Sequence, residues 1–202
     1  MKTSRLSFFA TLLALLVTLI PAASQAWEKS PSHAQSKAAR GDALLASMEA
    51  RRHFEGGRKL ERERNLPEAI ALYSKAASLA PDSAEVHFAL GEALSKAQRN
   101  QDALVRYTLA VTIAPEHRKA LFSRSQLCLR MNLNAQARKD LSRLIALEPK
   151  VASHYYQRAT TLMKLNCVTE AYHDFLRAHE LDKKYPRPKL LWENNSAAAK
   201  IA

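Results

Sequence analysis

Apolar and small side chains recur along this chain at an interval of 34 residues. Alanines stand at that interval at Ala69, Ala103, Ala137 and Ala171. Four positions after each alanine there is a large apolar or aromatic residue: Tyr73, Tyr107, Leu141 and Phe175. Twelve positions before each alanine there is a small residue: Gly57, Gly91, Ser125 and Ala159. A fixed period of this length indicates tandem repeats, each of which forms one supersecondary unit.

The period divides the chain into four units without insertion or deletion, at 50–83, 84–117, 118–151 and 152–185. Pro81, Pro115 and Pro149 close three of these units, because a proline cannot extend a helix. A small residue facing a large one lets two helices of a unit approach closely. A single unit cannot bury its apolar face, so the stacking of units must supply the core.

This pattern resembles that of the tetratricopeptide repeat family over 136 of the 202 residues. The second unit carries the resemblance best, through Leu90, Gly91, Leu94, Ala103, Tyr107, Ala110 and Pro115. The resemblance implies an all-α fold, a right-handed solenoid of four helix–turn–helix units. The repeat domain is expected at 42–185 and a cap and tail at 186–202. In the tail, Leu190, Leu191 and Trp192 are expected to form a short capping helix.

The resemblance also indicates a ligand surface, because the first helices of this family line a concave face. The fifth position of each unit is expected on that face and is aromatic: Phe54, Phe88, Phe122 and Tyr156. Eight positions later each unit has a basic residue: Arg62, Lys96, Arg130 and Lys164. Eight residues are just over two turns, so each pair shares a helix face about 12 Å apart. We predict an aromatic row beside a cationic stripe, suited to a peptide with apolar and acidic residues. The same regularity could instead reflect ancestry and leave a merely solvated basic face.

Some members of the family bind the C-terminal carboxylates of heat-shock chaperones through a clamp that requires asparagines. The corresponding positions here hold Phe54, Arg58, Ala89, Lys119 and Ser123. The required asparagines are missing, so the resemblance gives no support to a chaperone-adaptor role.

Two pairs of opposite charge recur in the third and fourth units. Arg124 precedes Asp140 by sixteen residues, and Arg158 precedes Asp174 by the same interval. The first two units lack both members of the pair. We interpret each pair as a structural ion pair that joins the two helices of a unit.

The N-terminus has the pattern of a secretory signal. Lys2 and Arg5 precede an apolar stretch that runs from Leu6 to Ile20, and small residues around Ala26 suit a signal peptidase. The stretch is short for a bilayer span, which needs about 20 residues. We therefore predict a cleaved signal peptide at 1–26, with an uncleaved signal anchor as the alternative.

Cleavage would place the mature N-terminus at Trp27 and the protein in the periplasm or outside the cell. Residues 27–41 lack helical apolar spacing and are predicted to be a flexible leader. In an oxidising compartment Cys128 and Cys167 could form a disulfide. The alternative is that both are small buried hydrophobic residues.

The composition narrows the range of functions. The chain has 47% hydrophobic and 25% charged residues, which are ordinary values for a globular protein. Its formal net charge is +12, which favours acidic peptides, anionic polymers or an anionic membrane surface, whereas export argues against nucleic acid. The chain contains no HExxH, GxSxG or glycine-rich phosphate motif. The sequence therefore predicts no enzyme, no cofactor and no metal site.

These observations predict an exported, non-catalytic interaction module or scaffold. Its partner would be a protein or a peptide segment, acidic in the favoured case, held in the concave groove. Two alternatives stay open: a permanent structural subunit of a cell-envelope assembly, or a binder of an anionic polymer or membrane surface. Apart from that last alternative, contact with a membrane is expected only through an uncleaved N-terminal segment.

Overall fold

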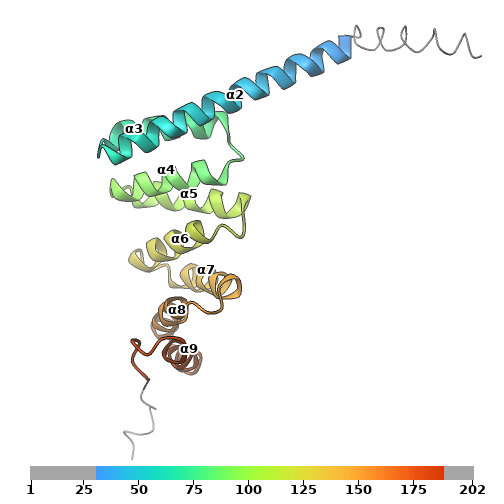
Figure 1. Ribbon diagram of the computed structural model, residues 1–202. Helices are drawn as coiled ribbons and strands as arrows, with labels where there is room; N and C mark the ends of the chain where they lie inside the picture. The colour runs from blue at the N-terminus through green and yellow to red at the C-terminus, as the bar shows by residue number, and fades with distance from the viewer. Residues whose placement is uncertain (1–30, 189–202) are drawn as a thin grey trace, which may run out of the picture. The chain divides into compact units, whose positions relative to one another are not determined.

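The computed structural model describes residues 31–188, and within that range the regular structure is helical, without a β-strand. The helices are α2 (Pro31–Arg62), α3 (Leu66–Leu79), α4 (Ala84–Lys96), α5 (Asn100–Ile113), α6 (Arg118–Arg130), α7 (Asn134–Leu147), α8 (Ala152–Lys164) and α9 (Val168–Leu181) (Figure 1). The chain divides into two units, Met1–Glu49 and Ala50–Ala202. The helical part of the first unit that is described is 31–49.

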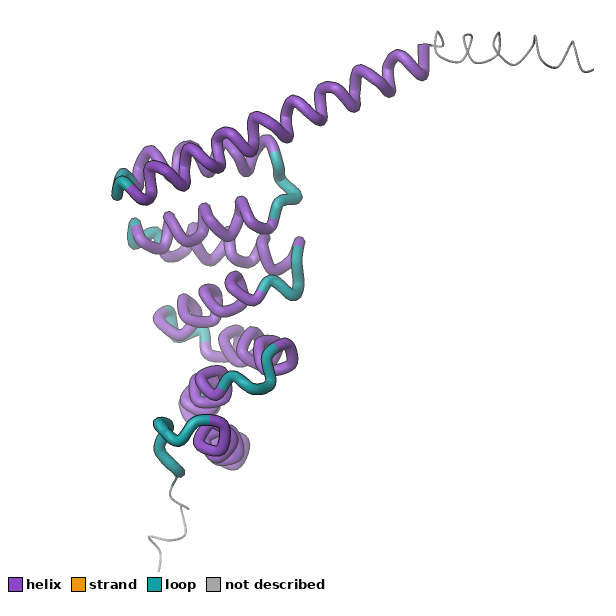
Figure 2. The backbone as a smooth tube through the Cα atoms, viewed as in Figure 1, coloured by secondary structure: helices purple, strands orange, loops and turns teal. Residues whose placement is uncertain are grey.

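The second unit is a stack of helix pairs. We call α4, α6, α8 and the part of α2 after Glu49 the first helices, and α3, α5, α7 and α9 the second helices. The first helices α4, α6 and α8 begin at Ala84, Arg118 and Ala152, and the second helices begin at the same interval of 34 residues. Each helix packs against its neighbours in sequence, so the pairs follow one another along the stack (Figures 1 and 2). The predicted all-α solenoid is confirmed.

The repeated small residues are where the two helices of a pair come closest. Ala69, Ala103, Ala137 and Ala171 are fully buried. A Cβ atom at Gly57 would lie 2.8 Å from the Tyr73 ring, and one at Gly91 would lie 2.7 Å from the Tyr107 ring. Glycine at these two positions therefore makes room for a buried tyrosine of the second helix.

The turn inside each pair has the same backbone geometry. Arg64, Gln98, Asn132 and Asn166 have φ angles of 63°, 61°, 59° and 59°. In the second pair, Gln98 N–H donates to Ser95 O and Arg99 N–H donates to Leu94 O, and the other three turns repeat both bonds. These two bonds with a left-handed residue form a Schellman motif, which usually has glycine at that position. The chain has none there.

The predicted flexible leader is corrected by the structure. Residues 31–41, which we expected to be part of an irregular 27–41 segment, belong to helix α2. The prediction relied on the absence of an apolar period. This stretch is instead rich in residues of high helix propensity, among them Ala34, Ala38, Ala39 and Arg40, and Pro31 is favourable at a first helical position.

The described chain ends shortly after α9. The backbone turns after Leu181, and the Tyr185 ring packs on that of Tyr156 with a centroid distance of 4.9 Å. His179 Nδ1 donates a hydrogen bond to Tyr185 O at 2.7 Å, which fixes this turn. The last pair is thus partly covered by 182–188. The predicted signal peptide at 1–26 and the capping helix at 190–193 lie outside the described residues.

No helix among residues 31–188 is both long and apolar enough to cross a bilayer. In the same range, no group of three or more His, Cys, Asp and Glu side chains is arranged to hold a metal ion.

Candidate interaction surface

The predicted aromatic row lies on the first helices, but three of its members are packed into the stack. The ring of Phe54 lies 5.7 Å from that of Tyr73, and the ring of Phe88 lies 6.1 Å from that of Tyr107. Tyr156 contacts Phe175 in the same way, at 5.3 Å. In these three pairs the first-helix ring is partly buried against a second-helix ring. The row therefore has a structural role as well as any role in binding.

Phe122 differs from the other three aromatic residues. Its side chain is 38% exposed, which makes it one of the exposed large hydrophobic residues of the described chain. The second helix of its pair has Leu141 where the other pairs have Tyr73, Tyr107 and Phe175. Leucine has no ring to cover the phenylalanine, and the ring contact of Phe122 is with His154 of the next pair, at 6.2 Å. Phe122 is thus the member of the row that is free to contact a partner.

The predicted cationic stripe is exposed, yet two of its members link successive pairs. Lys96 forms an ion pair with Glu61 of the preceding pair. Arg130 donates to Ser95 Oγ at 3.1 Å, and Ser95 holds the register position of Glu61 in the second pair. Lys96 and Arg130 are thus engaged in contacts within the stack.

The two ends of the stripe behave differently. Arg62 donates from Nε to Arg58 O in its own helix, at 3.2 Å. Lys164 is exposed, and the position that would hold its acceptor in the preceding pair is Leu129, which has no side-chain oxygen. Lys164 is therefore the member of the stripe whose charge is best placed for a partner.

Glu61 connects the stripe to the core. It accepts hydrogen bonds from Lys96 and, at 2.8 Å, from the Tyr73 hydroxyl. Burial opposes the ionisation of Glu61, but these hydrogen bonds and the charges of Lys96 and Arg58 outweigh it, so the pKa of Glu61 lies below its ordinary value. The acid stays charged at neutral pH and holds the first two pairs together.

Both predicted arginine–aspartate pairs are present. Arg124 Nε and Nη2 donate to Asp140 at 2.8 and 2.6 Å, and both side chains are buried. Arg158 donates twice to Asp174, at 2.7 and 2.8 Å, and its Nη1 donates to Ser142 Oγ of the preceding pair at 3.1 Å. The hydrogen bond to Asp174 raises the pKa of Arg158 above its usual value. Each pair joins the two helices of one unit, and Arg158 also joins two units.

The cysteines are both free thiols. Cys128 is buried in α6, and Cys167 is partly buried at the N-terminal end of α9. Cys167 therefore lies in the turn between the two helices of its pair. The structure does not contain the disulfide that we considered.

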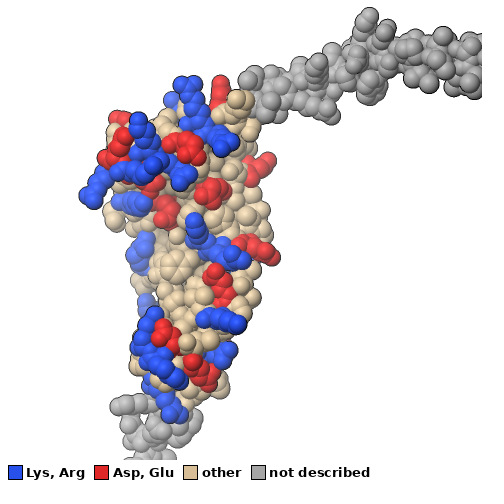
Figure 3. All heavy atoms as spheres, in the orientation of Figure 1, with Lys and Arg blue, Asp and Glu red and all other residues tan. Residues whose placement is uncertain are grey.

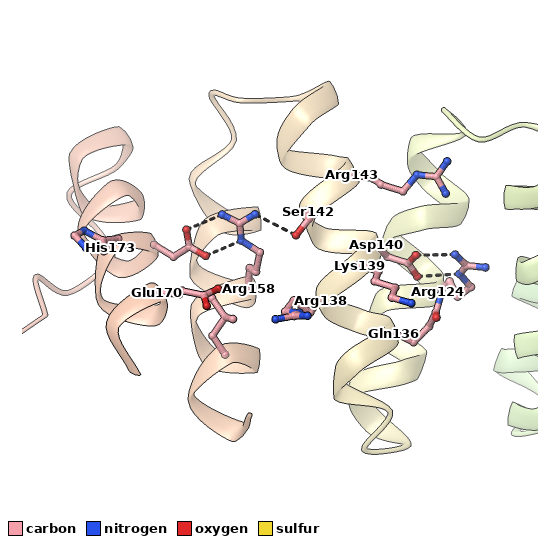
Figure 4. A pocket seen from close by; sticks show the side chains of 12 residues that line it. Arg124, Gln136, Arg138, Lys139, Asp140, Ser142, Arg143, Arg158, Glu170 and His173 are labelled. Carbon is pink, nitrogen blue, oxygen red and sulfur yellow. Dashed lines mark hydrogen bonds and ion pairs between the residues drawn. The ribbon is translucent and has the colours of Figure 1, made fainter. Parts of the chain in front are cut away.

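Sequence reasoning missed a cleft between the second helices of the last two pairs. Its volume is about 770 Å³, and it is lined by Arg138, Lys139 and Arg143 of α7, by Arg158 of α8, and by Glu170 and His173 of α9. Figure 4 shows Arg158 bonded to Ser142 on one side of this cleft and the doubly bonded Arg124 and Asp140 on the other. No motif marks the cleft, because its residues come together only when two units stack.

Charge is distributed along the whole stack. In Figure 3, basic side chains recur from the α2 end of the stack to the α9 end, interspersed with acidic ones and with uncharged surface between them. The excess of basic residues matches the charge balance of the sequence, 31 Lys and Arg against 19 Asp and Glu.

Comparisons with known proteins agree with this architecture. A family model described as TPR repeat matches residues 64–98. MamA from Desulfovibrio magneticus RS-1 is 18% identical with a TM-score of 0.62, over 67% of this chain and 77% of its own. YrrB, described as a TPR protein with an unusual peptide-binding site, is 18% identical with a TM-score of 0.60, over 65% of this chain and 68% of its own.

A third solved structure contains a ligand. The first TPR of Spaghetti (RPAP3) bound to the HSP90 peptide SRMEEVD is 22% identical with a TM-score of 0.53, over 59% of this chain and 98% of its own. At these identities the likeness shows the fold alone. No curated protein matches the chain significantly.

Proposed function

We propose that the chain is a tetratricopeptide repeat protein and acts as a non-catalytic interaction module, a proposal supported by the matched repeat at 64–98 and by the likeness of its fold to solved structures of that type. It binds a peptide segment of a partner protein on the face of its first helices, which we call the first-helix face. Two structural neighbours support a peptide ligand. YrrB is described as having a peptide-binding site, and the Spaghetti domain is bound to a peptide.

The observation that carries this proposal is the exposure of Phe122. An aromatic side chain held on a rigid helix loses little conformational entropy when it binds, and buried aromatic residues dominate many interfaces. The other three rings of the row are covered by the second helix or by the following pair, so they shape the face beside Phe122. The binding energy is therefore expected to centre on α6 and α8.

The charge of the face gives the chemistry of the partner. Lys164 on α8 is exposed and lacks an acceptor at the register position before it, whereas Lys96 and Arg130 are engaged. We expect a segment with one apolar anchor for Phe122 and an acidic residue for Lys164. The peptide SRMEEVD is a useful negative control, because the positions of the carboxylate clamp hold other residues here.

The place of action that we propose is the periplasm or the outside of the cell. It rests on the N-terminal pattern at 1–26. N-terminal sequencing of the protein from the cells that make it should find Trp27 as the first residue. Recovery of intact Met1 in the membrane fraction would favour the signal anchor instead.

Site-specific photo-crosslinking tests the interaction itself. A photoreactive phenylalanine analogue replaces Phe122 in the whole chain, and the same analogue replaces Ala71, an exposed residue of second helix α3, as the matched control. We expect a discrete crosslinked partner from position 122 and none from position 71. Crosslinks from position 71 alone would contradict the first-helix face as the site.

A further inference from the structure

The exposed face of α5 is apolar, unlike the corresponding faces of the other second helices. Val105, Leu109 and Ile113 are 57%, 38% and 37% exposed, and their spacing of four places them on one side of the helix. At the register positions of Val105 and Leu109, α3 has Ala71 and Lys75, α7 has Lys139 and Arg143, and α9 has His173 and Arg177. The second pair alone therefore presents large apolar side chains at both positions.

The polar residues of this face are satisfied within the helix. Thr108 donates its hydroxyl hydrogen to Leu104 O at 2.8 Å, and Thr112 donates to Thr108 O at 2.9 Å. Between Leu104 and Ile113 the exposed side chains are these two threonines and the three aliphatic residues. Charge enters this face only at its N-terminal end, where the partly exposed Arg106 and the Asp102–Arg99 ion pair lie beside Val105.

The neighbouring second helix, α7, is basic. Its outward side carries Arg138, Lys139 and Arg143, for which the structure shows no ion pair among the described residues. The one acid of α7 is Asp140, which is buried against Arg124. An apolar ridge on α5 therefore lies beside a positive ridge on α7.

A cleft separates the two ridges. Its volume is about 710 Å³, with Leu104 and Thr108 of α5 on one side, Lys139 of α7 on the other and Leu133 of the turn nearby. Leu133 is itself an exposed large hydrophobic residue. The cleft thus has Leu104 and Thr108 along α5, and Lys139 beside uncharged residues along α7, and its depth lets side chains of a ligand enter it.

We propose that this outer face, formed by α5 and α7, is a second interaction surface that binds an amphipathic acidic helix of another protein. The apolar stripe of the partner helix lies along Val105, Leu109 and the cleft, and its carboxylates face Lys139 and Arg143. α5 has 14 residues, about 21 Å, which matches a partner helix of about four turns. This is the helix-in-groove mode of recognition, with charge complementarity setting the orientation.

The same observations argue against two other occupants. A second copy of this chain would bring a net charge of +12 against the basic α7, so self-association through this face is disfavoured. A bilayer would lie flat across the ridges and leave the cleft unfilled, whereas the side chains of a helix can enter it.

A selection experiment tests the proposal. A displayed library of 18-residue peptides of high helix propensity is selected on the whole chain that carries Phe122→Ala, so that binding at the first-helix face is weakened. We expect selected peptides with apolar residues at i, i+3, i+4 and i+7 and with acidic residues beside that stripe. Their affinity for the unmodified chain is then measured by fluorescence anisotropy.

Variants on the two ridges give the expected effects. Leu109→Asp should weaken binding at least tenfold, and the double variant Lys139→Glu with Arg143→Glu should weaken it by a similar factor that shrinks as salt is raised. Lys75→Glu on α3, at the register position of Leu109 and Arg143, is the matched control and should bind like the parent. Circular dichroism and thermal unfolding establish that each variant is folded. If Leu109→Asp does not fold, Leu109→Ser replaces it in the binding measurement.

Other outcomes would overturn the proposal. These are a selection that yields no acidic amphipathic sequence, and peptides whose affinity is unchanged by the Leu109 and Lys139 variants. The proposal also fails if the whole chain floats with phosphatidylglycerol vesicles in a way that depends on Leu109. Sedimentation of a dimer that Leu109→Asp dissociates would assign the face to a second copy.

Discussion

The guanidinium of Arg124 and the carboxylate of Asp140 meet through two hydrogen bonds inside the third helix pair, with side-chain exposures of 7% and 1%. Removing one partner leaves a buried charge without its counter-ion. We therefore expect Arg124→Met or Asp140→Leu alone to lower the free energy of unfolding by about 3–5 kcal/mol. Replacing both residues together should lower the free energy of unfolding much less, because neither charge then remains in the core. Denaturant unfolding of the three variants measures this coupling.

The fourth pair supplies the comparison. Arg158 and Asp174 form the same two bonds but are 23% and 9% exposed, so water screens the charge left by a single replacement. Arg158→Met should therefore lower the free energy of unfolding by less than Arg124→Met does. If single and double replacements at Arg124 and Asp140 destabilise equally, the ion pair is not the source of the effect.

The turn residue Gln98 is expected to limit stability. Its φ of 61° lies in the left-handed region, which costs a residue with a Cβ about 1 kcal/mol or more. Gln98→Gly should therefore stabilise the protein by about 1 kcal/mol. Lys75→Gly, in the middle of α3, should instead destabilise it by about 1 kcal/mol. Thermal and denaturant unfolding measure the stability change of each variant. A loss of stability from Gln98→Gly would contradict the left-handed conformation of Gln98 in this turn.

The two thiols should react at very different rates. Burial, and then the nearby charge of Asp140, raise the pKa of the Cys128 thiol to about 11, although Arg124 opposes the shift. At pH 8 only about one Cys128 in a thousand is then ionised, and the thiolate is the reactive form. We expect one rapidly reacting thiol in the native chain, lost in Cys167→Ser and kept in Cys128→Ser. Two equal rates, or no free thiol before reduction, would contradict this.

The repeat period was sufficient to predict most of the fold, because buried alanines, large partners and closing prolines all follow the same 34-residue register. It could not predict helix 31–41, where helix propensity acts without an apolar period. Nor could it predict the left-handed residues at Arg64 and Gln98, since neither residue type favours that conformation. In those turns the backbone conformation is determined by the packing of the two helices and not by the residue type.

The binding face was predicted only in part, for a physical reason. The register places Phe122 at the position that Phe88 and Tyr156 hold in their units, but the exposure of Phe122 depends on Leu141, nineteen residues later in another helix. Whether Lys96 and Lys164 are free depends on Glu61 and Leu129 of the preceding units. The outer face of α5 and α7 could not be predicted for the same reason, because Leu104 and Lys139 come to line one cleft only when the units stack.

Peptide binding on the first-helix face is best tested with the partner segment identified by crosslinking at position 122. Its dissociation rate is measured by surface-binding kinetics on the whole chain, on Phe122→Ala and on Leu109→Ala as the matched aliphatic control on the other face. We predict that Phe122→Ala raises the dissociation rate by an amount equivalent to about 2 kcal/mol, whereas Leu109→Ala leaves it unchanged. Unchanged binding by Phe122→Ala together with loss of binding by Leu109→Ala would contradict it.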